Sequence, residues 1–86
     1  METISITVNS ISLDFDYARK ISWAVARSYN PNTSLTAWFD REQDRYFPSQ
    51  KEGDDAGLPD WEEYGRNHGG QKKVVVGDGE YVFIFT

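Results

Sequence analysis

The feature that most constrains the fold is a run near the end of the chain that is apolar on both of its alternating faces. Its two faces carry Tyr81, Phe83 and Phe85 on one side and Val82 and Ile84 on the other. A strand of this kind is usually central in its sheet, or covered on both sides. The run Lys72 to Val76 precedes it, and Gly77-Asp78-Gly79 lies between the two. A Gly/Asp turn between β-rich runs predicts a hairpin of residues 72–76 and 80–85.

The clearest single element is a helix over Phe15 to Tyr29. At 100° per residue, the following residues fall within about 140° and predict its core-facing stripe: Tyr17, Ala18, Ile21, Ala24, Val25, Ser28 and Tyr29. Asp14 or Asp16 can cap its first turn. Asn30-Pro31 ends it, because the residue before proline avoids the α region.

The remaining elements complete a β-α-β-β-(short α)-β-β order. Alternation predicts strands over Thr3 to Val8 and Ser34 to Asp40, with a short partner strand at Arg45-Tyr46-Phe47. Capping-box spacing predicts a short helix from Asp60 to about Asn67, and a strand through Trp61 and Tyr64 is the alternative. Residues 49–59 offer little to bury and predict a mobile loop.

The expected fold class is therefore α+β. We expect one layer of helix, formed by the long helix, against a mostly antiparallel sheet of about four or five strands. The last strand is expected inside the sheet, with the first strand beside it in either direction.

Length and composition limit the class of protein. A chain of 86 residues predicts a single domain over 1–86. It has no cysteine, which favours a reducing, cytoplasmic location, and its first residues lack the features of a signal peptide. Its apolar runs are too short to span a bilayer. The net charge of −5 disfavours nucleic acid and anionic membrane surfaces as partners.

The acidity is concentrated in the middle of the chain. Residues 40–63 contain nine acidic and three basic side chains. Their spacing does not match a calcium-binding loop, so a solvated charged segment is the expectation. With one histidine and no cysteine, no metal site and no cofactor are predicted.

Trp23 interrupts the predicted pattern of the long helix. It projects opposite the predicted core stripe, between Lys20 and Arg27. Because a large aromatic side chain is costly to leave in water, something is expected to cover it. One hypothesis is a lid from the segment 46–61, with Phe47 and Trp61. The other is a protein partner or a second copy of the chain, which would make Lys20, Trp23 and Arg27 an interaction surface.

His68 is the other candidate centre, with Tyr64 and Arg66 nearby in sequence. The functional interpretation is a ligand-binding site or a general base among glycines. The structural interpretation is a loop histidine beside the end of a helix. No residue is assigned a catalytic role, because no nucleophile with a suitable partner is present.

Two stretches resemble a small uncharacterised prokaryotic family, found mainly in anaerobic bacteria and archaea and classed as a domain of unknown function. They are Tyr17-Ala18-Arg19-Lys20-Ile21-Ser22-Trp23-Ala24-Val25-Ala26-Arg27 and Gly77-Asp78-Gly79-Glu80-Tyr81-Val82-Phe83-Ile84-Phe85. The resemblance covers nearly the whole chain. It implies no assigned activity, so it transfers no site residues.

Three functional hypotheses follow. The first is a non-catalytic protein-interaction or self-association module, acting through the Trp23 face of the helix or an exposed sheet edge as a homodimer or with a protein partner. The second is a small enzyme or ligand-binding domain centred on His68. The third is binding of single-stranded nucleic acid by the aromatic strand, which the acidic charge disfavours.

Overall fold

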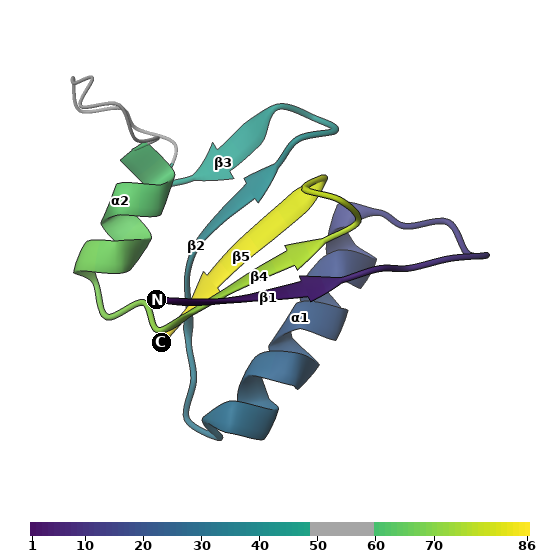
Figure 1. Ribbon diagram of the computed structural model, residues 1–86. Helices are drawn as coiled ribbons and strands as arrows, with labels where there is room; N and C mark the ends of the chain where they lie inside the picture. Colours follow the sequence, from purple (N-terminus) through teal and green to yellow (C-terminus); the bar gives the residue numbers. More distant parts are fainter. Residues whose placement is uncertain (49–59) are drawn as a thin grey trace.

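A computed structural model describes residues 1–48 and 60–86 of the chain. Its elements in chain order are β1 (Glu2–Ile6), α1 (Phe15–Tyr29), β2 (Leu35–Asp40), β3 (Arg45–Phe47), α2 (Asp60–Asn67), β4 (Lys72–Val76) and β5 (Tyr81–Phe85). The expected α+β class and element order are confirmed, and the segment 60–67 is a helix (Figure 1). The loop predicted at 49–59 lies outside the described residues.

The strands form one sheet in the order β1-β4-β5-β2-β3, with β5 in the middle as predicted. β5 pairs antiparallel with both β4 and β2, and β3 pairs antiparallel with β2. β1 pairs with β4, in parallel. The expectation that the first strand lies beside the last is therefore wrong, because the hairpin partner β4 and the strand β2 already occupy both edges of β5.

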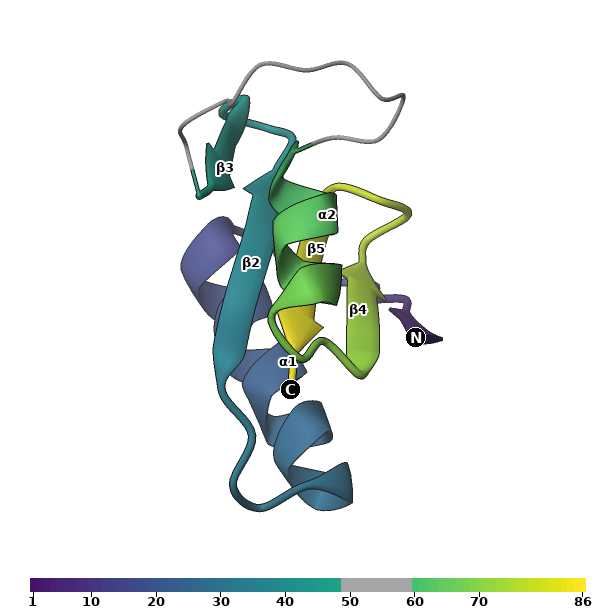
Figure 2. The ribbon, with the colours of Figure 1, turned by 90° about the vertical axis from the view of Figure 1, so that its left-hand side faces the viewer.

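The two helices cover opposite faces of this sheet (Figure 2). α1 packs over β4 and β5. On the other face, Trp61 of α2 packs with Ala37, Val82 and Ile84 and stacks on Phe39, with ring centroids 5.5 Å apart. The expectation of a single helical layer is therefore wrong. The second layer explains why β5 is apolar on both faces and buried along its whole length.

The face that α1 turns to the sheet differs from the predicted stripe. Its buried residues are the small Ala18, Ser22 and Ala26, at intervals of four. Four residues of the predicted stripe are exposed: Tyr17, Ala24, Ser28 and Tyr29. The reason is steric, since the sheet fills this layer with the large buried rings of Tyr81, Phe83 and Phe85. Small side chains let the helix backbone approach those rings closely.

The prediction that Trp23 points away from the core is wrong for the same reason. Its ring packs at the flank of α1 against Phe85, with ring centroids 5.7 Å apart in an edge-to-face arrangement. The cover comes from β5, whereas Trp61 of the suggested lid lies on the opposite face of the sheet. Arg27 places its guanidinium 5.4 Å from the Trp23 ring, a cation–π contact.

Candidate functional site

An open pocket of about 450 Å³ lies on the hairpin formed by β2 and β3. It is lined by Trp38, Asp44, Arg45, Tyr46 and Phe47. Because α1 packs over β4 and β5, the same side of the sheet is less covered at β2 and β3. Side chains of the β2–β3 hairpin are therefore partly exposed to solvent, whereas the central strand β5 is buried along its whole length.

The aromatic wall of the pocket is built by cross-strand pairing. Trp38 and Phe47 lie directly opposite each other in the β2–β3 register, and their rings stack with centroids 6.3 Å apart. The ring of Phe15 also packs against the Trp38 ring, with the two ring centroids 4.6 Å apart. The Asp14 side chain accepts a hydrogen bond from the Tyr17 N–H at 2.8 Å, which begins α1 at this position and places Phe15 in its first turn. Phe47 keeps 46% of its surface exposed, so one wall of the pocket is available to a ligand.

An ion pair holds the polar side of the pocket. The fully buried carboxylate of Asp40 contacts the guanidinium of Arg45 at 2.9 Å and accepts the backbone N–H of Gln43 at 3.3 Å. The Arg45 guanidinium also lies 5.5 Å from the Phe15 ring and 5.8 Å from the Trp38 ring. The ion pair with Asp40 and the two ring contacts together hold the Arg45 guanidinium at the wall of the pocket.

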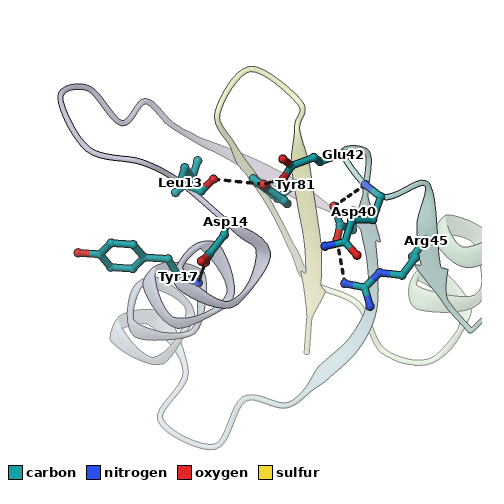
Figure 3. A network of polar contacts seen from close by, with 8 residues as sticks. Leu13, Asp14, Tyr17, Asp40, Glu42, Arg45 and Tyr81 are labelled. Carbon is teal, nitrogen blue, oxygen red and sulfur yellow. Dashed lines mark hydrogen bonds and ion pairs between the residues drawn. The ribbon is translucent and has the colours of Figure 1, made fainter.

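The turn that joins β2 and β3 is hydrogen-bonded to Tyr81 of β5 (Figure 3) and to Glu80, the residue before β5. The Tyr81 hydroxyl donates to Oε1 of Glu42 at 2.6 Å and lies 3.4 Å from the Leu13 carbonyl oxygen. Burial, reinforced by the hydrogen bond to Glu42, raises the pKa of Tyr81 above its ordinary value. The backbone N–H of Arg41 donates to the Glu80 carbonyl at 2.9 Å. The turn is therefore held at several points, and it carries Asp44 at the rim of the pocket in a left-handed conformation, with φ of 54°.

The charges of the site do not cancel. Arg45 is compensated by Asp40, whereas no side-chain partner of Asp44 lies within residues 1–48 and 60–86. The pocket thus combines two aromatic faces with one unpaired carboxylate. That combination favours a ligand with an apolar body and a positive charge.

The pocket is lined by three aromatic side chains, one arginine and one aspartate. Among the residues that the structure describes, no group of three or more His, Cys, Asp or Glu side chains is arranged to hold a metal ion. The lining residues contain no serine, cysteine or histidine that would act as a nucleophile or general base.

The structure brings the predicted residues Tyr64 and His68 together. Their rings stack with centroids 3.9 Å apart, and Nδ1 of His68 lies 2.9 Å from the Tyr64 carbonyl oxygen. Because a carbonyl oxygen only accepts, Nδ1 carries the proton and closes the last turn of α2. Arg66 pairs with Glu62 at 3.5 Å, and Glu62 also binds Lys73 at 3.0 Å. The histidine thus has a structural role at the helix end, and ligand binding by these three residues stays a prediction.

The glycines around His68 also have a packing explanation. A Cβ at Gly65 would lie 3.0 Å from the Ile84 side chain, and one at Gly70 would lie 2.6 Å from the Gly65 carbonyl oxygen. They permit the close approach of α2 and its closing turn to the sheet. Close backbone packing accounts for these two glycines without a ligand.

The second predicted set, Lys20, Trp23 and Arg27, lies on α1. Lys20 pairs with Asp16 at 3.3 Å, and both side chains are largely exposed. Trp23 is partly buried against the core, which weakens the argument that it needs an external cover. An interaction surface formed by Lys20, Trp23 and Arg27 stays a prediction, and the outward position of Trp23 no longer supports it.

The pocket residues Trp38, Arg45 and Phe47 were missed as a site by sequence reasoning. Both strands were predicted, and a signal was present. If Asp40 is paired with Arg45 across the turn, every second residue of each strand lies on the same face of the sheet. Trp38 and Phe47 then share that face with the ion pair.

Comparison with known proteins places the chain in a family. The model of a domain of unknown function, DUF5619, matches residues 1–85. The chain belongs to this family. The expected resemblance to a family without an assigned function is thereby confirmed.

The DUF5619 fold is also present in a solved structure. The crystal structure of the protein AF1514 from Archeoglobus fulgidus DSM 4304 aligns with a TM-score of 0.77 at 21% identity. The alignment covers 100% of this chain and 93% of that chain, which shows a shared fold. No protein with a curated description matches this DUF5619 chain. Within its described residues, no helix has the length and apolar character needed to cross a membrane.

Proposed function

We propose that this domain is a non-catalytic protein-interaction module that binds a basic peptide segment of a partner in the pocket of Trp38, Asp44, Arg45, Tyr46 and Phe47. The observation that carries the proposal is that the pocket is lined both by the exposed ring of Phe47 and by the carboxylate of Asp44, which has no side-chain partner among residues 1–48 and 60–86. We further propose a cytoplasmic location, which rests on the cysteine-free composition.

A lysine or arginine side chain fits both elements of the site. Its methylene stem packs on the aromatic wall while its charged end reaches the carboxylate at the rim. The ring of Phe47 attracts a cation placed over its face, whereas the Trp38 ring already holds Arg45. Within the described parts of the chain, the pocket therefore offers the exposed face of one aromatic ring and one carboxylate without a side-chain partner.

The electrostatic surroundings favour the same sign of ligand. The chain carries a net charge of −5, and residues 40–63 hold nine of its fourteen acidic side chains. The negative electrostatic potential that these charges produce accelerates the approach of a basic segment and repels an anion. Arg45 does not reverse this preference, because its charge is already compensated by Asp40.

A titration observed by nuclear magnetic resonance tests the proposal. The probes are the tetra-arginine and tetralysine amides, with tetraglutamate as the opposite charge. The indole N–H signal of Trp38 is the reporter, and those of Trp23 and Trp61 are internal references because neither residue lines the pocket. We expect the basic peptides to shift the Trp38 signal saturably and to leave the other two nearly unchanged.

Two variants separate this pocket from general attraction to an acidic protein. Asp44→Asn is expected to weaken binding by about two- to fivefold, the usual value of an exposed ion pair. Asp78→Asn is its matched control, because Asp78 is also exposed and has a left-handed backbone conformation in a hairpin turn, with φ of 56°. This control should change the binding of the basic peptides little. Phe47→Ala should weaken binding further.

Two results contradict the proposal. If tetraglutamate moves the Trp38 signal and the basic peptides do not, the pocket binds anions through Arg45. Equal losses in Asp44→Asn and Asp78→Asn would show that the peptides respond only to overall charge.

A further inference from the structure

β1 forms an open edge of the sheet. It is the terminal strand in the order β1-β4-β5-β2-β3, and no strand among the described residues pairs with its outer side (Figure 1). Its five residues keep a regular register with β4, from Glu2 opposite Lys72 to Ile6 opposite Val76. The edge is therefore long enough and regular enough to accept another strand.

The hydrogen bonds at the two ends of this ladder show which residues face outward. Glu2 N–H donates to the Gln71 carbonyl, and the Ile6 carbonyl accepts from Gly77 N–H, each at 3.0 Å. In a parallel ladder the bonded residues alternate, so the even-numbered residues direct their peptide groups toward β4. The peptide groups of Thr3 and Ser5 then point away from the sheet.

Apart from the charged side chain of Glu2 at its first position, β1 lacks the usual devices that protect a sheet edge. It contains no proline, no lysine and no bulge. The other edge strand is shorter, since β3 has three residues, Arg45 to Phe47. β1 is therefore the longer of the two sheet edges at which another strand could pair.

We propose that β1 pairs antiparallel with β1 of a second copy of this chain, so that two five-stranded sheets join into one. The pairing we infer has its two-fold axis at Ile4. This register matches Thr3 with the partner's Ser5 and places the two Ile4 residues opposite each other. It is the register in which Glu2–Ile6 is paired along its whole length.

The side chains of the edge suit this arrangement. Ile4 is half-buried on the α1 side, beside the core residue Val74, and pairing it with itself covers its remaining apolar surface. Thr3 and Ser5 are exposed on the opposite face, and Thr–Ser pairs across a ladder can hydrogen bond. Both faces of the new ladder therefore gain contacts between matched side chains.

The charges of the edge are compatible with a second copy. Glu2 is paired with Lys72 at 2.8 Å, so the one charged side chain of β1 is compensated. Antiparallel pairing also places the two Glu2 residues at opposite ends of the ladder, about 13 Å apart at the usual rise per residue. The net charge of −5 on each copy opposes association at long range, so salt should strengthen the dimer.

Sedimentation equilibrium on the untagged chain, from low micromolar to millimolar concentration, measures the association. We expect the average mass to rise from 9.9 kDa toward twice that value, and to rise earlier at higher salt. In the same samples, hydrogen exchange of the Thr3 and Ser5 amides should slow with concentration. The Ile4 amide should be protected throughout, because it already bonds to β4.

Cysteine substitution tests the register, since the chain has no cysteine of its own. Ile4→Cys places two thiols opposite each other in a close, non-hydrogen-bonded pair and should form a disulfide dimer under mild oxidation. Ser5→Cys is the matched control, because its thiol faces the partner's Thr3, and it should cross-link at least tenfold more slowly.

Charge substitution tests whether the same contact forms without a cross-link. Thr3→Lys/Ser5→Lys sets like charges opposite each other in both pairs and should weaken the dimer at least tenfold. Thr3→Glu/Ser5→Lys sets opposite charges across the axis and should restore or strengthen it. Because Thr3 lies beside Lys73, urea unfolding at low concentration is measured for each variant to separate folding from association.

A mass that stays at 9.9 kDa up to millimolar concentration, with unchanged exchange at Thr3 and Ser5, would overturn the proposal. The proposal would also be overturned if Thr3→Lys/Ser5→Lys and Thr3→Glu/Ser5→Lys formed equally stable dimers, since such a dimer would use a surface other than β1. Equal cross-linking of Ile4→Cys and Ser5→Cys would likewise reject the paired ladder in favour of random collision.

Discussion

Asp40 is fully buried, and directly opposite it in the β2–β3 ladder stands Arg45, whose half-exposed guanidinium contacts the Asp40 carboxylate at 2.9 Å. This pair connects the interior of the sheet to the candidate binding pocket. The carboxylate is inside, and the cation that neutralises it forms part of the pocket wall. Stability of the hairpin and the shape of the site therefore depend on the same contact.

Arg45→Met should destabilise the fold, because it leaves the buried Asp40 carboxylate without its cation. Removing one partner of a fully buried pair costs about 3–5 kcal/mol, and the half-exposed position of Arg45 reduces the expected loss to about 2 kcal/mol. Urea unfolding measures it. The double variant Asp40→Ala/Arg45→Met should lose less than Arg45→Met alone. An equal or larger loss in the double variant would show that packing, and not the unpaired charge, sets the cost.

Ser22→Ala should stabilise the protein. The Ser22 hydroxyl is buried under α1 with no hydrogen-bond partner among the described residues, and alanine is also the better helix former. The expected gain in the free energy of unfolding is about 1 kcal/mol. Ser28→Ala is the matched control on the same helix. Its hydroxyl is exposed and donates to the Val25 carbonyl at 2.6 Å, so little gain is expected, and a similar gain in both would point to helix propensity alone.

Stability should fall at alkaline pH through Tyr81. Its pKa is raised in the folded state by burial and by the hydrogen bond to Glu42, so folding favours the neutral phenol. This contribution is complete below the unfolded tyrosine pKa of about 10 and is lost progressively as the pH rises above it. Tyr81→Phe should flatten the decline, at a cost of about 1–2 kcal/mol near neutral pH. The exposed Tyr17→Phe should keep the decline of the unmodified chain.

Gly65→Ala should destabilise the protein although it lies inside a helix. At an unconstrained helical site this change gains about 1 kcal/mol. Here the new Cβ would lie 3.0 Å from two atoms of Ile84 and 3.1 Å from Ala37, so we expect a net loss of about 1–2 kcal/mol from overpacking. Ile84→Val removes one of the two contacted atoms. If crowding is the cause, combining it with Gly65→Ala should cost less than the sum of the two single changes in thermal unfolding.

The local elements were predictable because they follow from neighbouring residues. The helix of Phe15 to Tyr29 begins at its Asp14 cap and stops before Asn30-Pro31, as predicted. The runs 45–47, 60–67 and 72–76 have their predicted bounds, and the two-sided apolar character of Tyr81 to Phe85 correctly placed that strand inside the sheet. Turn chemistry, capping and alternation act within a few residues, so they are visible in the sequence.

The face of α1 was predicted incorrectly because the sequence shows the helix without its partner. The predicted apolar stripe correctly includes Ala18 but omits Ser22 and Ala26, the two other residues of α1 that the sheet buries. The error over Trp23 has the same origin. Which helical face fits is a property of the two packed surfaces together.

The sequence by itself determined the α+β class, the order of the elements and the central place of the last strand. It also contained every residue of the candidate pocket without showing that they meet. Only the tertiary structure decided that α2 covers the second face, that β1 joins β4 and is left as an open edge, and that Trp38, Asp44, Arg45 and Phe47 surround one pocket. Propensity and periodicity are local, whereas packing and strand pairing depend on which distant surfaces fit each other.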